Sequence, residues 1–547
     1  MSASANIAQH LPLMAARQPN HPALKIPRGR TRCGDIDYLT LSFDQLDTEV
    51  DAWAARLRAR GVQPGYRTLV MVRQGLPLIA AAFALFKIGA IPIVIDPGMG
   101  LKSFLACVAR SQPRALLGIP FAQLISHIAR PAFRSVELRI SASANPTAQL
   151  APRVSLPASR SALLVDRNAT DLAAILFTSG STGAPKGACY EHGMFAAQVQ
   201  LIRETYAIEP GEIDLPMLPV FALFNPALGM TTVVPEIDPS RPARVDPAKI
   251  VQAIQQEQVT NSFGSPTLWG KIADHCADHA ITLSSLRRVL CAGAPVPASL
   301  WEKSHRLLPH GRLHSPYGAT EALPVSSVSA QEITPGSVHG APVGKPIPGI
   351  DVKIIALTDA PIATLTDARE LPVGKIGEII VRGPVVTKQY DALPAATAAT
   401  KISDPKDTAI IWHRMGDCGY LDAERRLWFC GRKAERIETS SGPVFTEPSE
   451  QVFRPQPGVA RCALIGLGLR GAQTPALVVQ PTNKLSRAAK LALATALRER
   501  ARQHAHTAAI TQFFFHPAFP VDVRHNAKIH RLTLTSWAAT AQPITIP

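Results

Sequence analysis

The stretch "TLVMVRQGLPLIAAAFALFKIGAIPIVIDPG", residues 68–98, decides the fold of this chain. Residues 68–72 predict a buried strand, and the apolar run over 76–98 predicts a buried helix, a turn and a second buried strand. Lys87 and Asp96 stand inside that run, so we expect no membrane-spanning helix there. Strand, helix and strand in succession are typical of an α/β sheet with helices on both faces.

The alternation extends in both directions from this stretch. Upstream, residues 43–60 place apolar side chains at steps of three and four residues, which predicts an amphipathic helix ended by Gly61. Downstream, strand and helix patterns recur around 111–130. The proline-rich stretches 216–247 and 341–350 are expected to be loops.

The last third of the chain has a different pattern. Residues 377–386, "GEIIVRGPVV", and 419–432, "GYLDAERRLWFCGR", predict strands and a hairpin. Beyond them we expect a strand pair and then a helix over 486–505, with Leu491 and Leu497 facing inward.

The length of the chain indicates more than one domain. At 547 residues it exceeds the size at which one hydrophobic core keeps growing. The sequence changes character near residue 432. We therefore expect a large α/β domain over 1–431 and a small α+β domain over 432–547.

The chain is basic, with 57 Lys and Arg against 41 Asp and Glu and a net charge of +16. Basic residues form no run of five or more and do not alternate with aromatic residues, so a nucleic-acid partner is not expected. The charge suits anionic substrates or peripheral contact with an anionic membrane. The eight cysteines form no CxxC pair and the N-terminus lacks a secretory signal, so a reduced, cytoplasmic setting is expected.

A candidate phosphate loop follows the predicted strand "AAILFT". In "TSGSTGAPKG", residues 178–187, small residues let backbone N–H groups approach phosphate oxygens, and Lys186 can neutralise them. The GxxxxGK[ST] pattern of a Walker A loop is absent. Taken alone, the stretch fits a flexible Ser/Gly linker as well.

Two further segments suit a nucleotide. In "SPYGATE", residues 315–321, Tyr317 can stack on a base, Thr320 can bind a phosphate and Glu321 can hold Mg²⁺. Alone, this segment is also typical of a turn with a solvated glutamate. In "AGAP", residues 292–295, the small residues after a predicted strand let a flat ring lie against the backbone.

Acidic and basic residues of the last third of the chain complete the candidate set. Asp417 and Arg432 lie on the predicted hairpin, where Asp417 can accept hydrogen bonds from two ribose hydroxyls. A surface salt bridge between these two residues is the alternative. Lys528 lies in a short loop, where a lone lysine usually faces solvent.

Together and in this order, these segments resemble the adenylate-forming superfamily of acyl-CoA synthetases, luciferases and peptide-synthetase adenylation domains. The resemblance implies a large N-terminal domain of α/β sheets with a β-barrel-like portion and a small mobile C-terminal domain, with a hinge at Arg432 to Ala434. It also implies that a carboxylate attacks the α-phosphate of Mg·ATP, giving acyl-AMP and pyrophosphate. The implied catalytic residues are Lys186, Thr320, Glu321 and Lys528, with Glu321 on Mg²⁺. The implied ATP-binding residues are Thr178, Ser179, Gly180, Ser181, Thr182, Gly183, Lys186, Gly293, Ala294, Pro295, Tyr317, Gly318, Ala319, Thr320, Asp417 and Arg432.

Residues 218–247 and 519–531 look closest to one branch, the β-lactone synthetases of bacterial long-chain olefin biosynthesis. That branch implies a 2-alkyl-3-hydroxy fatty acid whose own hydroxyl closes the lactone and expels AMP. Ala222 stands where acyl-CoA ligases commonly carry His, and Ala527 replaces the Gly before the late lysine. These departures weaken the case for thioester formation. A long-chain acyl-CoA or acyl-carrier-protein ligase is the alternative, and a nucleotide-binding scaffold without catalysis is a third hypothesis.

The second half-reaction is less defined by the sequence. The branch implies association with hydrolase-like and reductase enzymes of the olefin pathway. The base for the 3-hydroxyl is unassigned, because His525 and His530 can both be surface residues. An apolar acyl tunnel is expected near the following residues, although core packing explains them equally well: Phe221, Leu223, Phe224, Leu228 and Met230.

Overall fold

The computed structural model describes residues 4–154, 156, 160–178, 184–238, 244–333, 339–521 and 529–547. The chain divides into two compact units. The first comprises Met1–Val325, Ile347–Ile350 and Gly383–Lys401, and the second comprises Ser326–Pro346, Asp351–Arg382 and Ile402–Pro547. The predicted boundary at residue 432 stays a prediction.

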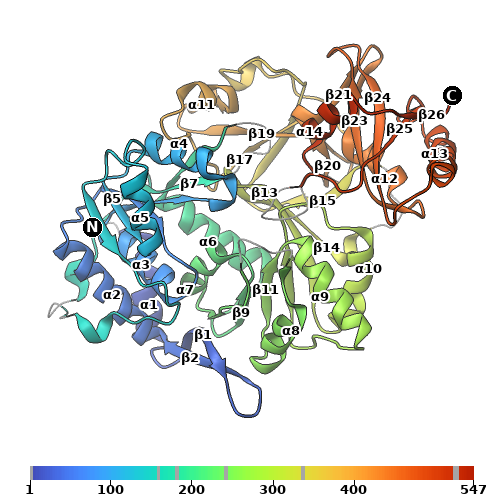
Figure 1. Ribbon diagram of the computed structural model, residues 1–547. Coiled ribbons are helices and arrows are strands. Elements are labelled where there is room, and N and C mark those ends of the chain that lie inside the picture. The colour runs from blue at the N-terminus through green and yellow to red at the C-terminus, as the bar shows by residue number, and fades with distance from the viewer. Residues whose placement is uncertain are drawn as a thin grey trace. The chain divides into compact units, whose positions relative to one another are not determined.

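A six-stranded sheet in the first unit contains the stretch that decides the fold (Figure 1). Its order is β6-β5-β3-β4-β7-β8, parallel except for the last pair. Its elements, with the helices between them, are α2 (Phe43–Ala59), β3 (Arg67–Met71), α3 (Leu76–Lys87), β4 (Ile91–Ile95), α4 (Leu101–Ser111), β5 (Ala115–Gly118), α5 (Pro120–Ile128), β6 (Leu138–Ser141), β7 (Leu172–Thr178), β8 (Lys186–Glu191) and α6 (His192–Tyr206). The predicted helix over 43–60 and the strand, helix and strand over 68–98 are confirmed.

Successive strand residues face opposite sides of this sheet, so both faces are covered. Leu69 packs with Phe104 of α4, whereas its neighbour Val70 belongs to the cluster that contains Phe83 of α3. Lys87 is buried at the end of α3, where it pairs with Asp51 and lies 3.4 Å from Asp47 of α2. Across the described residues, no helix is long and apolar enough to cross a membrane.

A second group of strands in the first unit follows the order β13-β12-β11-β9-β10-β1-β2. Neighbours are parallel, except that β1 and β2 are antiparallel. The elements are α1 (His10–Arg17), β1 (Pro22–Arg30), β2 (Ile36–Ser42), β9 (Ile213–Pro216), α7 (Asn225–Leu228), β10 (Thr231–Val233), α8 (Pro247–Gln256), β11 (Asn261–Gly264), α9 (Pro266–Asp278), β12 (Arg288–Cys291), α10 (Ala298–Leu307), β13 (Arg312–Ala319), the first part of β14 (Ala322–Ser329) and α11 (Pro394–Thr400).

The second unit starts with antiparallel strands in the order β16-β17-β19-β20-β15. They are β15 (Ala341–Pro346), β16 (Asp351–Ile355), β17 (Gly377–Arg382), β19 (Ile411–Leu421) and β20 (Leu427–Arg432), with the short β18 (Lys401–Ser403) beside β19. The predicted hairpin is confirmed. Within the described strands this order is open, and no barrel closes. The expectation of a loop over 341–350 is wrong for 341–346, where β15 accommodates its prolines at a bulge after Pro342 and at its last residue, whereas 347–350 form a turn.

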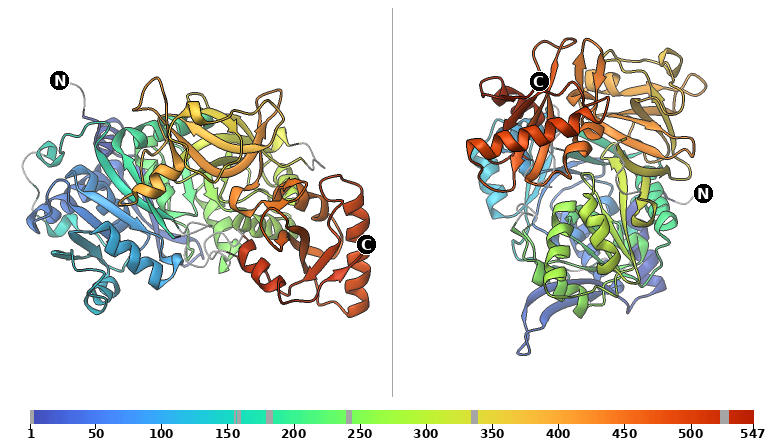
Figure 2. Two further views of the ribbon diagram at one scale, coloured as in Figure 1. Left: turned by 90° about the horizontal axis from the view of Figure 1, so that it is seen from above. Right: turned by 90° about the vertical axis from the view of Figure 1, so that its right-hand side faces the viewer.

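The remainder of the second unit is an α+β layer. It contains β21 (Ile437–Thr439), β22 (Gly442–Val444), α12 (Thr446–Phe453), β23 (Val459–Leu467), β24 (Thr474–Pro481), α13 (Arg487–Arg502), β25 (Gln512–Phe515), α14 (Arg531–Ala538) and β26 (Ile544–Thr545). Helix α13, the long red-orange helix of Figure 2, packs on the sheet β23-β24-β25-β26. Leu497 is buried as expected, but Leu491 is 51% exposed and its expected inward position is wrong. Six residues turn a helix to a position about 120° away, so the two leucines cannot share one face.

Candidate active site

The frame of the predicted phosphate loop lies in the first unit. Strand β7 ends at Thr178, and Lys186 opens β8 directly opposite it. The segment between them therefore starts and ends at one antiparallel pair. The following predicted residues lie outside the described part of the chain: Ser179, Gly180, Ser181, Thr182, Gly183, the side chain of Thr178, and Lys528.

Thr320 and Glu321 form the turn between β13 and β14. Gly318 makes this turn possible, because a Cβ there would lie 2.6 Å from the carbonyl oxygen of Ala322. The hydroxyl of Tyr190 donates to the carbonyl oxygen of Thr320. Since Tyr190 belongs to β8, the turn is tied to the strand that follows the predicted phosphate loop.

A segment far along the chain joins these two parts of the site. We call residues 386–391 the strap. The Thr387 amide donates to the Glu321 carbonyl oxygen at 2.8 Å, and the Asp391 amide donates to the Gly187 carbonyl oxygen at 2.8 Å. The strap therefore contacts both the Thr320–Glu321 turn and β8 within the first unit.

Tyr390 of the strap contacts two of the predicted catalytic residues. Its hydroxyl donates to Glu321 Oε1 at 2.7 Å, and Lys186 Nζ lies 5.1 Å from the centre of its ring. Lys401 Nζ lies 5.7 Å from the same ring centre and donates to Thr387 Oγ1 at 3.1 Å. The structure thus brings Lys186 and Glu321, which are far apart in sequence, against one tyrosine, Lys186 near its ring and Glu321 at its hydroxyl.

Burial shapes the electrostatics of this cluster. Desolvation lowers the pKa of Lys401 to about 7, while the Glu321 carboxylate opposes that shift and the Lys186 ammonium adds to it. Desolvation raises the pKa of the Tyr390 hydroxyl, and the charge of Glu321 raises it further. Such shifted groups in one place are a feature of functional sites.

Glu321 fits the expected role in holding Mg²⁺. Its carboxylate offers hard oxygen ligands, and the tyrosine hydrogen bond uses Oε1 only. Within the described residues, no three His, Cys, Asp or Glu side chains form a group that could hold a metal by themselves. Mg²⁺ commonly binds through one or two carboxylates together with substrate phosphates, so one glutamate beside a phosphate loop is sufficient.

The predicted adenine strip and Tyr317 lie at the same edge of the second strand group. Strands β12 and β13 are parallel, so the residues after β12 and those at the end of β13 are at neighbouring carboxyl ends. Gly293 has φ of +99°, a conformation that favours glycine. Around it, Ala294, Tyr317 and Ala319 are half-buried, and Pro295 is exposed.

Asp417 and Arg432 lie in the second unit, directly opposite each other on β19 and β20. An Arg432 guanidinium nitrogen lies 2.8 Å from Asp417 Oδ1. The salt bridge considered as the alternative is therefore present, but Asp417 is buried rather than on the surface. The ribose role of Asp417 stays a prediction.

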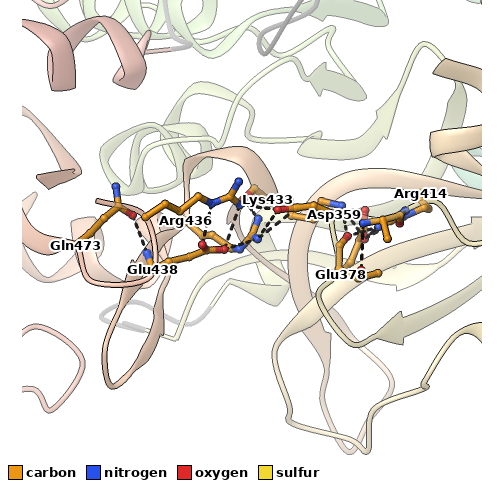
Figure 3. A network of polar contacts seen from close by, with 10 residues as sticks. Asp359, Glu378, Arg414, Lys433, Arg436, Glu438 and Gln473 are labelled. Atoms are coloured by element: carbon orange, nitrogen blue, oxygen red, sulfur yellow. Dashed lines mark hydrogen bonds and ion pairs between the residues drawn. The ribbon is translucent and has the colours of Figure 1, made fainter. Parts of the chain in front are cut away.

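A larger network of charges lies next to this pair in the second unit (Figure 3). Glu378 accepts from Arg414 at 2.6 Å and from Lys433 at 3.0 Å. Arg436 contacts Glu438 at 2.5 Å and Asp359 at 3.3 Å. Lys433 lies in the predicted hinge, so this network fastens the hinge segment to strands β17 and β19.

The residues expected near an acyl tunnel are distributed between core and margin. Leu228 and Met230 belong to the core, whereas Leu223 and Phe224 pack at its edge. Phe221 stacks on Phe263 with ring centres 3.6 Å apart. The tunnel itself stays a prediction. Of the two histidines flanking Lys528, His530 is exposed and His525 lies outside the described residues.

The strap and Lys401 carry no recognisable motif in the sequence. Both come from "VTKQYDALPAATAATK", residues 386–401, where a tyrosine and a lysine flank an alanine-rich helix without a motif. The available signal was the position of Lys401, the one charged residue in the segment "LPAATAATKIS" of apolar and small residues.

Comparison with known proteins agrees with this geometry. The family model described as AMP-binding enzyme matches residues 13–391. The olefin beta-lactone synthetase of Stenotrophomonas maltophilia is 43% identical, with 98% of this chain and 99% of the relative covered. The protein of the same name from Xanthomonas campestris pv. campestris is 42% identical, with 98% of each covered. The crystal structure of ATP-bound MatB from Rhodopseudomonas palustris has a TM-score of 0.79 at 21% identity, with 98% of this chain and 99% of that chain covered, and shows the shared fold.

Proposed function

The chain belongs to the AMP-binding enzyme family, and we propose that it activates a 2-alkyl-3-hydroxy fatty acid with ATP and closes it to a β-lactone in long-chain olefin biosynthesis. It is an ATP-dependent adenylate-forming ligase. The resemblance inferred from its motifs is confirmed.

The observation that carries the proposal is the contact of Tyr390 with both Glu321 and Lys186. It places a carboxylate for Mg²⁺ and an ammonium group for phosphates around one side chain. In the first half-reaction a carboxylate oxygen of the substrate attacks the α-phosphorus of ATP, and the bond to the β-phosphate breaks to release pyrophosphate. Mg²⁺ would neutralise phosphate charge beside Glu321, and Lys186 and Lys528 would stabilise charge on the phosphates.

The second half-reaction uses the substrate's own hydroxyl. Its oxygen attacks the acyl carbon, its proton passes to a base, and the bond to the AMP oxygen breaks. The products over both steps are the β-lactone, AMP and pyrophosphate. Tethering of the nucleophile favours closure, although ring strain opposes it.

We assign the remaining roles in the same proposal. The backbone of Thr178 to Gly183 would surround the phosphates, the Gly293-Ala294-Pro295 strip and Tyr317 would hold adenine, and Asp417 with Arg432 would hold ribose. Association with hydrolase-like and reductase enzymes of the pathway is proposed from the branch. All eight cysteines are free, which supports a reduced, cytoplasmic setting.

The test combines purified protein, Mg·ATP and a 2-alkyl-3-hydroxy acid without any thiol, followed by NMR of the product. We expect a β-lactone. Absence of lactone together with dependence on CoA would instead support an acyl-CoA ligase. Pyrophosphate exchange in the wild type but not in Lys528→Ala would exclude a scaffold without catalysis.

A further inference from the structure

Three large apolar side chains are exposed along one side of α5 in the first unit. Phe121 is 65% exposed, Leu124 56% and Ile128 74%. They follow one another at steps of three and four residues, so they share one face of the helix. A folded protein rarely leaves such a group in water unless the group contacts something else.

The opposite face of α5 already has its packing partners. Ala122 and Ser126 are buried, and Ile125 packs in the cluster that contains Leu116 and Phe133. The helix is therefore held on the sheet by its inner face. The exposed stripe is therefore a separate surface of the helix and does not belong to the core.

The N-terminal end of this stripe lies near the edge where β7 ends. Strands β3, β4, β5 and β7 run parallel, so their carboxyl ends share one edge of the sheet. Helix α5 follows β5 almost directly at this edge, and α4 follows β4 after the 3₁₀ turn Pro97–Met99. Leu101, the first residue of the neighbouring helix α4, is also 64% exposed.

The surrounding chain is strongly cationic. Residues 97–141 contain six basic residues, Lys102, Arg110, Arg114, Arg130, Arg134 and Arg139, against one acidic residue, Glu137. Glu137 pairs with Arg114. Lys102, Arg130 and Arg134 are exposed.

We propose that the apolar face of α5, made of Phe121, Leu124 and Ile128, docks on an anionic lipid bilayer, with the exposed basic residues Lys102, Arg130 and Arg134 of the flanking segments attracting its headgroups. Apolar side chains of a surface helix enter the boundary between headgroups and acyl chains, while adjacent basic residues attract anionic headgroups. A second copy of the chain fits less well, because a two-fold interface would bring the same basic residues against each other. The proposed function adds a reason for docking, since a long-chain acid partitions into bilayers, but binding is measured without substrate.

The experiment is flotation of the full chain with vesicles of equal parts phosphatidylglycerol and phosphatidylcholine, compared with vesicles of phosphatidylcholine alone. We expect the wild type to float with the anionic vesicles. The double variant Leu124→Glu, Ile128→Glu should lose binding by about tenfold or more. The variant Arg130→Ser, Arg134→Ser should lose most of its preference for anionic vesicles.

The matched control is Leu469→Glu, Leu491→Glu. These leucines are 84% and 51% exposed in the second unit, so the control has the same change of charge and apolar area elsewhere. It should bind like the wild type. Circular dichroism and pyrophosphate exchange with a short, water-soluble acid should match the wild type in every variant.

Two results would overturn the docking proposal. One is a wild type that fails to bind the anionic vesicles, or a control that loses as much binding as the α5 variant. The other is a wild-type dimer in light scattering that the α5 variant converts to a monomer, which would assign the face to a second copy. Absence of pyrophosphate exchange in the wild type would count against the proposed function alone.

Discussion

The charged residues around Tyr390 in the first unit and those around Glu378 in the second unit are arranged in opposite ways. Around Tyr390, Glu321 accepts from a phenol and Lys401 donates to a threonine hydroxyl, so these two charged groups hydrogen-bond neutral ones, while Asp391 beside them pairs with Arg67. Around Glu378, Arg414 and Lys433 contact the carboxylate directly.

The difference separates two uses of buried charge. A buried charged group that contacts only neutral partners can still act on a charged ligand. Its burial without an opposite charge lowers the stability of the fold. Charged groups that contact each other hold the fold, and removing one leaves the others without compensation. We therefore expect substitutions near Tyr390 to lower activity more than stability, and substitutions near Glu378 to do the reverse.

Glu321→Ala should have the largest effect. Loss of the proposed Mg²⁺ ligand should lower Mg²⁺-dependent pyrophosphate exchange by about two to three orders of magnitude, because charge on the phosphates is then less well stabilised. The free energy of unfolding should fall by only about 1 kcal/mol, the value of the lost hydrogen bond from Tyr390. Glu302→Ala on the surface of α10 is the control and should leave both quantities unchanged.

Glu378→Ala should show the reverse. Removing this carboxylate leaves Arg414 and Lys433 without it, and the free energy of unfolding measured in urea should fall by about 3 kcal/mol. This is the lower end of the range of about 3 to 5 kcal/mol for breaking a buried ion pair. The loss should not be larger, because Arg414 and Lys433 keep their hydrogen bonds to the carbonyl oxygens of Thr358 and Ala360. Glu370, which forms an exposed ion pair with Lys353, gives the control. The free energy of unfolding of Glu370→Ala should fall by less than about 1 kcal/mol. A large fall in exchange with unchanged stability would contradict the comparison.

Asp417→Ala tests a residue that is paired with another charge and is also proposed to bind a ligand. It pairs with Arg432, yet it is proposed to bind ribose. We expect the KM for ATP to rise about tenfold while kcat changes little, since hydrogen bonds to ribose are the same before and during reaction. Asp422→Ala on the same hairpin removes a pair with Arg426 and should leave the KM unchanged. An unchanged KM in Asp417→Ala would show that the residue serves only the fold.

Lys401→Met should show its effect as a change of stability with pH. Burial lowers the pKa of Lys401 from 10.5 to about 7, so between these values the unfolded chain binds one more proton than the folded chain. The free energy of unfolding of the wild type should therefore rise with pH across this window, by at most about 1.4 kcal/mol per pH unit. The variant should lack this rise in urea titrations at the two ends of the window. Equal slopes in both proteins would mean that Lys401 stays charged in the folded state.

The sequence predicts those parts of the fold that depend on local pattern. The apolar run over 76–98 gave α3 and β4, because helix and strand periods are visible in neighbouring residues. The partners of Lys87 could not be found in the same way, because Asp47 and Asp51 lie 40 and 36 residues away in the chain and meet it only through packing. The inward position expected for Leu491 fails, because a residue six positions from Leu497 turns about 120° away and the sheet beneath α13 packs the Leu497 face.

Those residues of the candidate site that belong to a recognisable motif could be predicted from the sequence. Thr320, Glu321 and Lys186 stand in recognisable segments, and their approach to one another in the first unit agrees with that reading. Tyr390 was not predictable, because its role depends on a hydrogen bond across 69 residues and not on its neighbours in sequence. Residues 179–183 and Lys528 lie outside the described part of the chain, so their roles stay predictions.

The path of the chain sets a rule for anyone who wishes to dissect the enzyme into fragments. The backbone passes from one compact unit to the other five times, after residues 325, 346, 350, 382 and 401. A gene truncated after residue 325 would retain the Thr320–Glu321 turn but lose the strap that holds it, together with Lys401. Separate expression of either unit therefore requires joining distant segments by designed linkers, and chimaeras should exchange residues 383–401 together with the first unit.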